Sequence, residues 1–150
     1  MKPNTNIIGA AGEYFVVYHL SLRGLVVGIP RAGSPGVDLL VTHPESLKQL
    51  TLQVKTAWHA SKPNCHRRRY WEWPIRFPDK VVESNDHLYV FVDLDHRSGR
   101  NEFHTTCFIV PSATVKRYPY ANSTRPSFKI TLEDEDLYRD KWEMITTELV

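Results

Sequence analysis

The chain has 150 residues, of which 41% are hydrophobic and 24% are charged. This balance is close to the globular average and excludes wholesale disorder, and the length predicts one domain over residues 1–150. The apolar runs fall far short of the roughly 20 residues that a membrane helix needs, and no apolar signal segment opens the chain. We therefore expect a cytoplasmic protein without a membrane partner, in which Cys65 and Cys107 stay reduced.

The formal net charge of +2 hides an uneven distribution of charge. Residues 131–150 contain seven acidic and two basic residues, a balance of −5, and the first 130 residues contain 17 basic and ten acidic residues, a balance of +7. The basic excess is densest between residues 59 and 80, where aromatic residues alternate with lysine and arginine. Basic and aromatic side chains together suit a nucleic acid. The alternative is a solvated loop whose tryptophans pack on the core.

In chain order, the first part of the sequence predicts one helix and three strands. Residues 4–23 indicate a helix, with a capping residue among Asn4, Thr5 and Asn6 and a glycine stop at Gly24. The strands are expected at 25–29, 37–42 and 50–56, the first two separated by the turn-forming residues 30–36.

The second part begins with a basic, aromatic insertion at about 57–80. The elements expected after it are a short helix at 79–85, strands at 88–94 and 102–110, a helix at 111–118, a strand at 128–132 and an acidic terminal helix at about 133–147. This order predicts an α/β (α+β) fold in which a mixed β-sheet is flanked by helices.

Four polar side chains break the expected pattern. Glu13 lies on the apolar face of the first helix, so its carboxylate should be largely buried. Asp38 opens the apolar strand that follows the glycine-rich turn, and Gln53 and Lys55 project to one face of the next strand. Each has a simpler explanation: a glutamate that reaches solvent, an aspartate that serves as a turn acceptor, and an edge strand with a wet face.

Taken together, the four positions predict a metal site. A hairpin would bring Asp38 and Gln53 together to share a divalent cation, with Lys55 beside it and Glu13 added from the preceding helix. Oxygen ligands of this kind suit Mg²⁺, which keeps several waters and bridges to phosphate. Such a site would polarise a phosphodiester and activate water, while the lysine orients the water or stabilises charge on phosphorus.

These residues resemble the PD-(D/E)XK nuclease superfamily, which has the restriction-endonuclease-like fold with an αβββαβ core. The resemblance rests on the helix that carries Glu13, on GVDLLV at 36–41 and on LQVKT at 52–56. It is most similar to the Gln-x-Lys branch, which includes Mrr-type restriction enzymes and some homing endonucleases, and to small relatives of Holliday junction resolvases. The resemblance implies that Asp38 is the principal metal ligand, Lys55 the catalytic lysine, Glu13 an accessory carboxylate and Gln53 the occupant of the second metal-binding position.

Two positions depart from the family pattern. Val37 replaces the proline that precedes the aspartate, and Gln53 replaces an acidic residue. An amide oxygen can still bind a metal, but the site loses one negative charge, which weakens the expected metal affinity.

The resulting hypothesis is a DNA endonuclease that depends on Mg²⁺ or Mn²⁺ and acts on duplex or branched DNA, with a homodimer implied by the family. The residues expected to contact nucleic acid are Lys62, Arg67, Arg68, Arg69, Trp71 and Arg76. No nucleotide cofactor is expected, because the glycines form no phosphate-binding loop motif. Two alternatives are a catalytically weakened or inactive nucleic-acid-binding module of the same fold, which Gln53 favours, and a structural or interaction protein whose acidic tail faces a partner.

Overall fold

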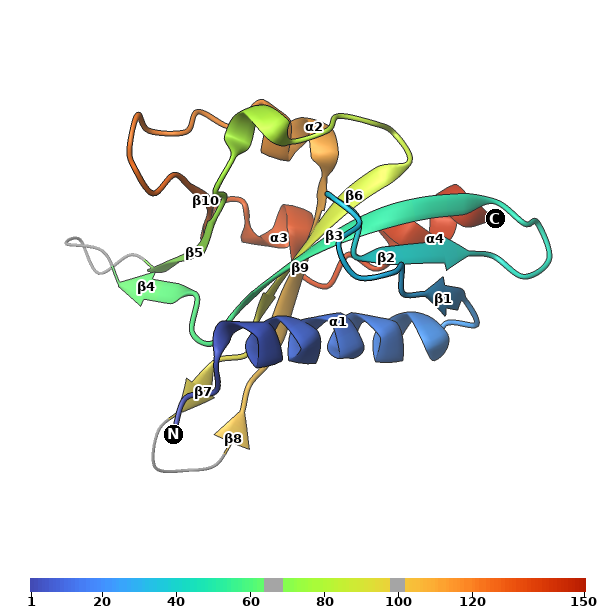
Figure 1. Ribbon diagram of the computed structural model, residues 1–150, viewed down its shortest axis with the longest axis horizontal. Coiled ribbons are helices and arrows are strands. Elements are labelled where there is room, and N and C mark those ends of the chain that lie inside the picture. The colour runs from blue at the N-terminus through green and yellow to red at the C-terminus, as the bar shows by residue number, and fades with distance from the viewer. Residues whose placement is uncertain (64–68, 98–101) are drawn as a thin grey trace.

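The computed structural model describes residues 1–63, 69–97 and 102–150. Its central element is a five-stranded mixed sheet with helices packed on it (Figure 1). In spatial order the strands are β1 (Val26–Gly28), β2 (Leu39–Thr42), β3 (Gln49–Ala57), β6 (His87–Asp93) and β9 (Thr106–Pro111). β3 and β6 are parallel, and the other neighbours are antiparallel. The predicted class, a mixed sheet flanked by helices, is confirmed.

Two strands in the described part of region 57–80 belong to a second sheet, so the region is not simply a solvated loop, although its tryptophans pack on the core as that alternative expected. Its strands β4 (Ser61–Pro63) and β5 (Arg69–Pro74) pair with β10 (Ser127–Thr131) in the order β10-β5-β4. The inward-facing Trp71 and Trp73 pack against Phe108, and the Trp73 indole nitrogen donates a hydrogen bond to the carbonyl of Val92 at 3.0 Å. Only 5% of Trp71 is exposed. The prediction that Trp71 contacts nucleic acid is therefore wrong, because its ring belongs to the core.

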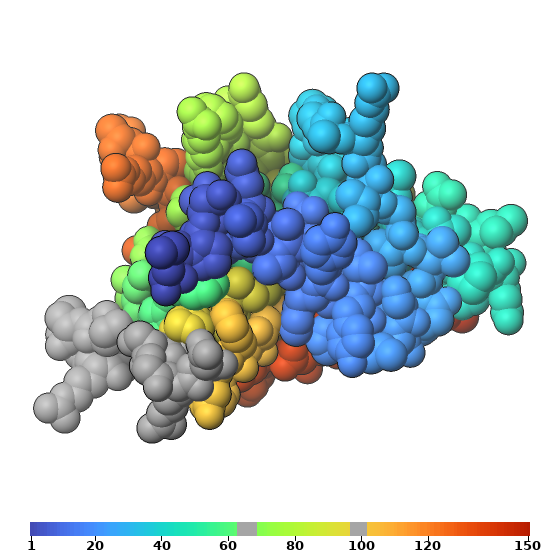
Figure 2. Space-filling view, turned by 60° about the horizontal axis from the view of Figure 1, so that its bottom comes forward, coloured from blue at the N-terminus to red at the C-terminus, as the bar shows by residue number. Residues whose placement is uncertain are grey.

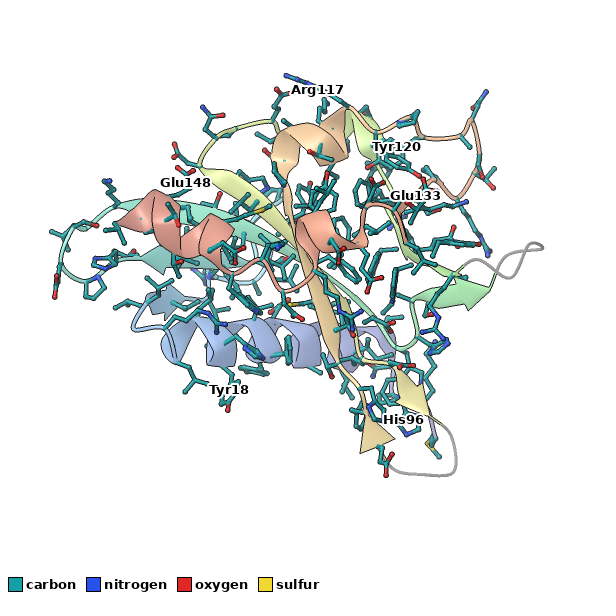
Figure 3. The ribbon with its side chains drawn as sticks, turned by 180° about the vertical axis from the view of Figure 1, so that it is seen from behind. Tyr18, His96, Arg117, Tyr120, Glu133 and Glu148 are labelled. Carbon is teal, nitrogen blue, oxygen red and sulfur yellow. The ribbon has the colours of Figure 1, made fainter. Side chains whose placement is uncertain are left out.

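The first helix, α1 (Thr5–Ser21), begins and ends close to the predicted limits. The Asn4 side chain accepts a hydrogen bond from the Ile7 nitrogen at 3.0 Å, and the chain turns after the helix at Gly24, whose φ is +78°. Leu20 is fully buried between the helix and the sheet, whereas Tyr18 points away from the molecule (Figure 3). α1 therefore covers the sheet with one side and exposes the other.

α1 approaches β3 closely at Gly12. A Cβ atom at this position would lie 1.8 Å from Oγ1 of Thr56. That hydroxyl is the one buried side-chain nitrogen or oxygen atom in the described residues without a hydrogen-bond partner. Glycine is therefore required for the contact that sets the height of α1 above the sheet.

The carboxyl-terminal region differs from the single helix predicted at about 133–147. It contains two short helices, α3 (Glu135–Tyr138) and α4 (Glu143–Leu149), with Asp140 between them at a φ of +52°. A continuous right-handed helix excludes this conformation. The Asp140 nitrogen donates to the Cys107 carbonyl at 3.0 Å, which holds the break against β9, and α4 buries Ile145 in the core.

Among the shorter elements, one predicted helix is confirmed, another is shorter than expected and one predicted strand is divided. The helix predicted at 79–85 is one turn of 3₁₀ helix, η1 (Pro78–Lys80), and α2 (Ser112–Lys116) matches the helix expected after Pro111. The strand predicted at 102–110 is divided, because β8 (Glu102–Phe103) pairs with β7 (His96–Arg97) in a hairpin outside the main sheet. Within the described residues, no helix has the length and apolar character needed to cross a membrane.

Candidate catalytic and metal-binding site

The two faces of the central sheet carry different side chains. Leu52 and Val54 of β3 face α1 and α4, so Gln53 and Lys55 alternate onto the other face. On that face the second sheet covers the aromatic side chains of β6 and β9, but this cluster includes no residue of β2. Gln53 and Lys55 therefore lie at the edge of the hydrophobic cluster between the two sheets.

Asp38 lies where β2 leaves β3. The last ladder pair at this end is Leu39 with Leu52, and the Asp38 nitrogen donates to the Leu52 carbonyl at 2.8 Å. Oδ2 of Asp38 then accepts two further hydrogen bonds, from the backbone nitrogen of Val54 at 2.7 Å and from the side-chain amide of Gln53. The carboxylate thus replaces the missing strand partner and is fixed on the side of β3 to which Gln53 projects.

The pKa of Asp38 is raised above the ordinary value for aspartate. Burial is the largest cause, because it disfavours the ionised carboxylate. The hydrogen bond from Val54, the positive charge of Lys55, the hydrogen bond from Gln53 and the charge of His87 act in the opposite direction. The positive charge of Lys55 therefore lies near enough to Asp38 to oppose the rise in its pKa.

Glu13 joins this group from α1. It is half-buried, and its pKa is raised first by burial and second by the negative charge of Asp38. Two carboxylates that repel each other in a partly buried place are a common arrangement at cation sites. Gln53 thus contacts Asp38 directly, and the charges of Lys55 and Glu13 act on it, although the side chain of Glu13 is less buried than its helix position indicated.

Three groups at this site have unused bonding capacity. In the described part of the chain, Oδ1 of Asp38, the Glu13 carboxylate and the Lys55 ammonium make no hydrogen bond or close ion pair. None of them is fully enclosed, since Thr56 holds the one enclosed unpartnered atom among these residues. The site therefore presents two carboxylates and one cation to whatever enters from solvent.

The donor set fits a hard divalent cation. No group of three or more histidine, cysteine, aspartate or glutamate side chains in residues 1–63, 69–97 and 102–150 is arranged to hold a metal ion. A cation here would depend on Asp38, Glu13 and the amide oxygen of Gln53, with water completing the shell, and Mg²⁺ accepts such a set. The amide nitrogen of Gln53 now faces Asp38, and rotation about the last side-chain torsion presents the oxygen instead.

His87, which was not among the predicted site residues, lies close to this site. Its Nδ1 is 2.7 Å from Oγ1 of Thr51, the β3 residue with which it is in register. Burial lowers the pKa of His87, and the charge of Asp38 acts against that shift. The ring lines a pocket of about 370 Å³ that also includes Gly36 and Val37, next to Asp38. A histidine in register with Thr51 could have been found only by pairing β3 with β6 in parallel.

The residues expected to contact nucleic acid have different positions. Lys62, Arg69 and Arg76 are exposed, and the Arg76 guanidinium lies over the ring of Phe77 at 5.1 Å. Arg67 and Arg68 lie outside the described residues. The exposed members therefore remain candidates, whereas Trp71 belongs to the core.

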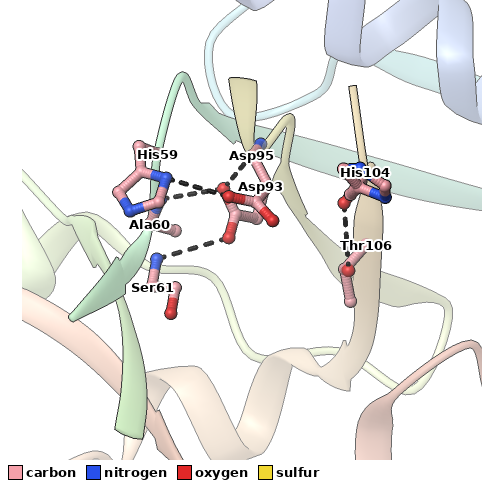
Figure 4. Close-up of polar contacts among 7 residues, drawn as sticks. All are labelled: His59, Ala60, Ser61, Asp93, Asp95, His104 and Thr106. Atoms are coloured by element: carbon pink, nitrogen blue, oxygen red, sulfur yellow. Dashed lines mark hydrogen bonds and ion pairs between the residues drawn. The ribbon is translucent and has the colours of Figure 1, made fainter. Parts of the chain in front are cut away.

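A second acidic group, at the carboxyl end of β6, has a structural role. Asp93 is 1% exposed and accepts hydrogen bonds from the backbone nitrogens of Ala60 at 2.8 Å, Asp95 at 3.0 Å and Ser61 at 3.3 Å (Figure 4). His59 lies 3.0 Å from Asp95 in the same group. Because its oxygens are occupied by backbone donors, Asp93 fixes the start of the second sheet.

Comparisons with known proteins agree with the fold. No family model matches the chain, and no curated protein matches it. Among solved structures, the chain is similar to a bacterial homing endonuclease, I-Ssp6803I, with a TM-score of 0.64 and 14% sequence identity. The match covers 99% of this chain and 95% of that one. The two chains therefore share a mixed α+β fold over nearly their whole length.

Proposed function

We propose that the protein is a metal-dependent DNA endonuclease that hydrolyses phosphodiester bonds in duplex or branched DNA. The observation that carries the proposal is the convergence on Asp38 of the Gln53 amide and the charges of Lys55 and Glu13. Metal-binding oxygens beside a lysine suit phosphodiester hydrolysis, and they lie in a fold shared with a homing endonuclease. The PD-(D/E)XK assignment, in its Gln-x-Lys form, belongs to this proposal.

Each residue has a distinct role in the proposal. Asp38, Gln53 and Glu13 would hold Mg²⁺, or Mn²⁺, through oxygen atoms. When bound, the ion supplies Lewis acidity to the scissile phosphate and lowers the pKa of the attacking water. The Lys55 ammonium donates hydrogen bonds to that water or to a phosphate oxygen and stabilises the negative charge that develops there.

The test is cleavage of plasmid and branched DNA with Mg²⁺ or Mn²⁺. We expect Asp38→Ala and Lys55→Ala each to lower the cleavage rate by roughly 10²–10⁴-fold, the range for loss of one acid–base or electrostatic group. Glu148→Ala on α4 and Lys48→Ala at the far end of β3 remove the same charges elsewhere and should leave the rate unchanged. If wild-type protein cleaves DNA and both site variants retain that activity, the assignment is wrong.

A second candidate function is a nucleic-acid-binding module without catalysis. The hydrogen bond from Gln53 to Asp38 favours it, because the amide satisfies the carboxylate without a metal. In that case neither cation supports cleavage, and Asp38→Ala leaves DNA affinity intact. Cleavage that is lost on Asp38→Ala would contradict this function.

A homodimer is part of the endonuclease proposal, by analogy to the PD-(D/E)XK family, because two active sites can each cut one strand of a duplex. Light scattering after size-exclusion chromatography should give twice the chain mass at concentrations that support duplex cleavage. A monomer that cuts both strands under those conditions would contradict the dimer without affecting the site.

A further inference from the structure

A pocket of about 540 Å³ lies where α1 begins, β3 ends and the second sheet starts. Figure 2 shows the amino-terminal residues, in dark blue, lying against the green segment that follows β3. The side chains that matter for its chemistry are Lys2, Thr5, Thr56, His59, Lys62 and Glu72. We name this region the charged pocket.

Lys2 and Lys62 are the unneutralised charges of the charged pocket. Both are exposed, and within the described residues neither has a hydrogen bond or ion pair to a carboxylate. Two unpaired ammonium groups that line one concavity attract an anion more strongly than isolated surface lysines do.

The acidic groups near the charged pocket are already engaged. Glu72 accepts a hydrogen bond from the Ser127 hydroxyl at 2.5 Å and lies 4.0 Å from the Lys129 ammonium. Asp95 is paired with His59 at 3.0 Å. The positive end of the 17-residue helix α1 also opens at this place, with Thr5 as its first residue. Lys2 and Lys62 are therefore the cationic groups that a phosphate entering the pocket would meet.

The charged pocket and the candidate site lie on the same two elements, β3 and α1, but share no residue. On β3 it begins at Thr56, the residue after Lys55. On α1, Thr5 and Glu13 are separated by about 12 Å at 1.5 Å per residue.

We propose that the charged pocket binds a backbone phosphate of DNA, separate from the phosphate whose bond is placed at Lys55. The inference rests on the proposed function in that DNA is taken as the substrate. Lys2 and Lys62 contact the phosphate as charges, so binding is independent of base sequence.

The test measures binding separately from cleavage. Fluorescence anisotropy with a 30-base-pair duplex, over a series of salt concentrations, is carried out with EDTA in an Asp38→Asn background. We expect Lys2→Gln with Lys62→Gln to weaken binding roughly tenfold or more and to reduce the salt slope by about two. The matched control, Lys48→Gln with Lys116→Gln, removes the same charge elsewhere and should change affinity less than threefold. Lys2→Arg with Lys62→Arg keeps the charge and should retain affinity.

Several outcomes would contradict the proposal that the charged pocket binds DNA. Equal weakening by both glutamine pairs shows that only net charge matters, and tighter binding of an RNA duplex of the same sequence shows that DNA is not the preferred ligand. Absence of duplex binding at low salt also overturns it. Salt-dependent binding that needs Lys2 and Lys62, without cleavage by wild-type protein under any metal, supports the pocket and contradicts the endonuclease.

Discussion

At the scale of single residues, Asp38 shows a conflict between stability and function. Its carboxylate is held by Val54 and Gln53, yet burial still raises its pKa. A group with a raised pKa in the folded state binds its proton more tightly there than in the unfolded state. The ionised form, which any cation would require, therefore costs folding free energy.

We predict that Asp38→Asn raises the free energy of unfolding by about 1 kcal/mol at neutral pH while abolishing cleavage. Asparagine keeps an oxygen for Val54 and removes the buried charge. The wild-type free energy of unfolding falls as pH rises from the ordinary value of 3.8 through the raised pKa of Asp38, so the advantage of the variant is present above that pKa and disappears in acid. Urea denaturation of both proteins from pH 4 to pH 8 measures this difference.

The control for this prediction is Asp136→Asn, at an exposed position on α3. This variant should leave the pH dependence of the free energy of unfolding unchanged. Cleavage by the wild type should decline as pH falls through the same range, because protonated Asp38 cannot serve as a ligand. If the difference in free energy of unfolding between the wild type and Asp38→Asn grows as the pH falls, the raised pKa of Asp38 is contradicted.

The residues of the candidate site could be predicted from the sequence because each breaks a local pattern. Glu13 interrupts an apolar helix face, and Gln53 and Lys55 share one face of an apolar strand. His87 could not be found in this way, because its place beside Thr51 depends on the parallel pairing of β3 with β6. Lys2 could not be found either, because only the folded chain brings it to Lys62.

At the scale of elements, the position of α1 depends on its contact with β3. Gly12 faces Thr56 with no room for a Cβ atom, whereas Gly9 on the same helix has nothing within 4 Å. Gly12 is therefore needed for the packing of α1 on β3, whereas Gly9, in the same helix of 17 residues, is not.

We predict opposite effects of alanine at these two positions. Gly12→Ala should lower the free energy of unfolding by about 1–3 kcal/mol, the cost of overpacking. Gly9→Ala should raise it by roughly 0.5–1 kcal/mol, because alanine favours the helix. Adding Thr56→Ala to Gly12→Ala should recover part of the loss, which a double-mutant cycle by urea denaturation measures. Equal changes in the free energy of unfolding for Gly9→Ala and Gly12→Ala would contradict the close contact between α1 and β3 at Gly12.

Elements with strong local signals were predictable, and those decided by distant contacts were not. The cap at Asn4 and the stop at Gly24 mark α1 in the sequence itself. The break at Asp140 depends on its hydrogen bond to Cys107, 33 residues away, so the acidic composition of 131–150 indicated one helix instead. The tryptophans of β5 resembled a nucleic-acid contact until the second sheet placed them against Phe91 and Phe108.

At the scale of the whole molecule, a bound cation should stabilise the fold. Glu13 and Asp38 repel each other, and an ion between them removes that repulsion. We predict that Mg²⁺ or Mn²⁺ at ten times its dissociation constant raises the free energy of unfolding by about 1.4 kcal/mol. For a chain of this size that corresponds to a rise in Tm of roughly 3–6 °C. Thermal melts with and without EDTA measure the effect, and an equal rise in Asp38→Asn would contradict binding at this site.

The parallel pairing of β3 with β6 also determines when the chain can fold during synthesis. The two strands are joined by a long connection that carries β4 and β5, and the second sheet takes its third strand, β10, from Ser127–Thr131. Neither sheet is therefore complete until most of the polypeptide has left the ribosome. A nascent chain that ends before Ser127 exposes Trp71 and Trp73, the kind of surface that chaperones bind and that aggregates when translation stalls.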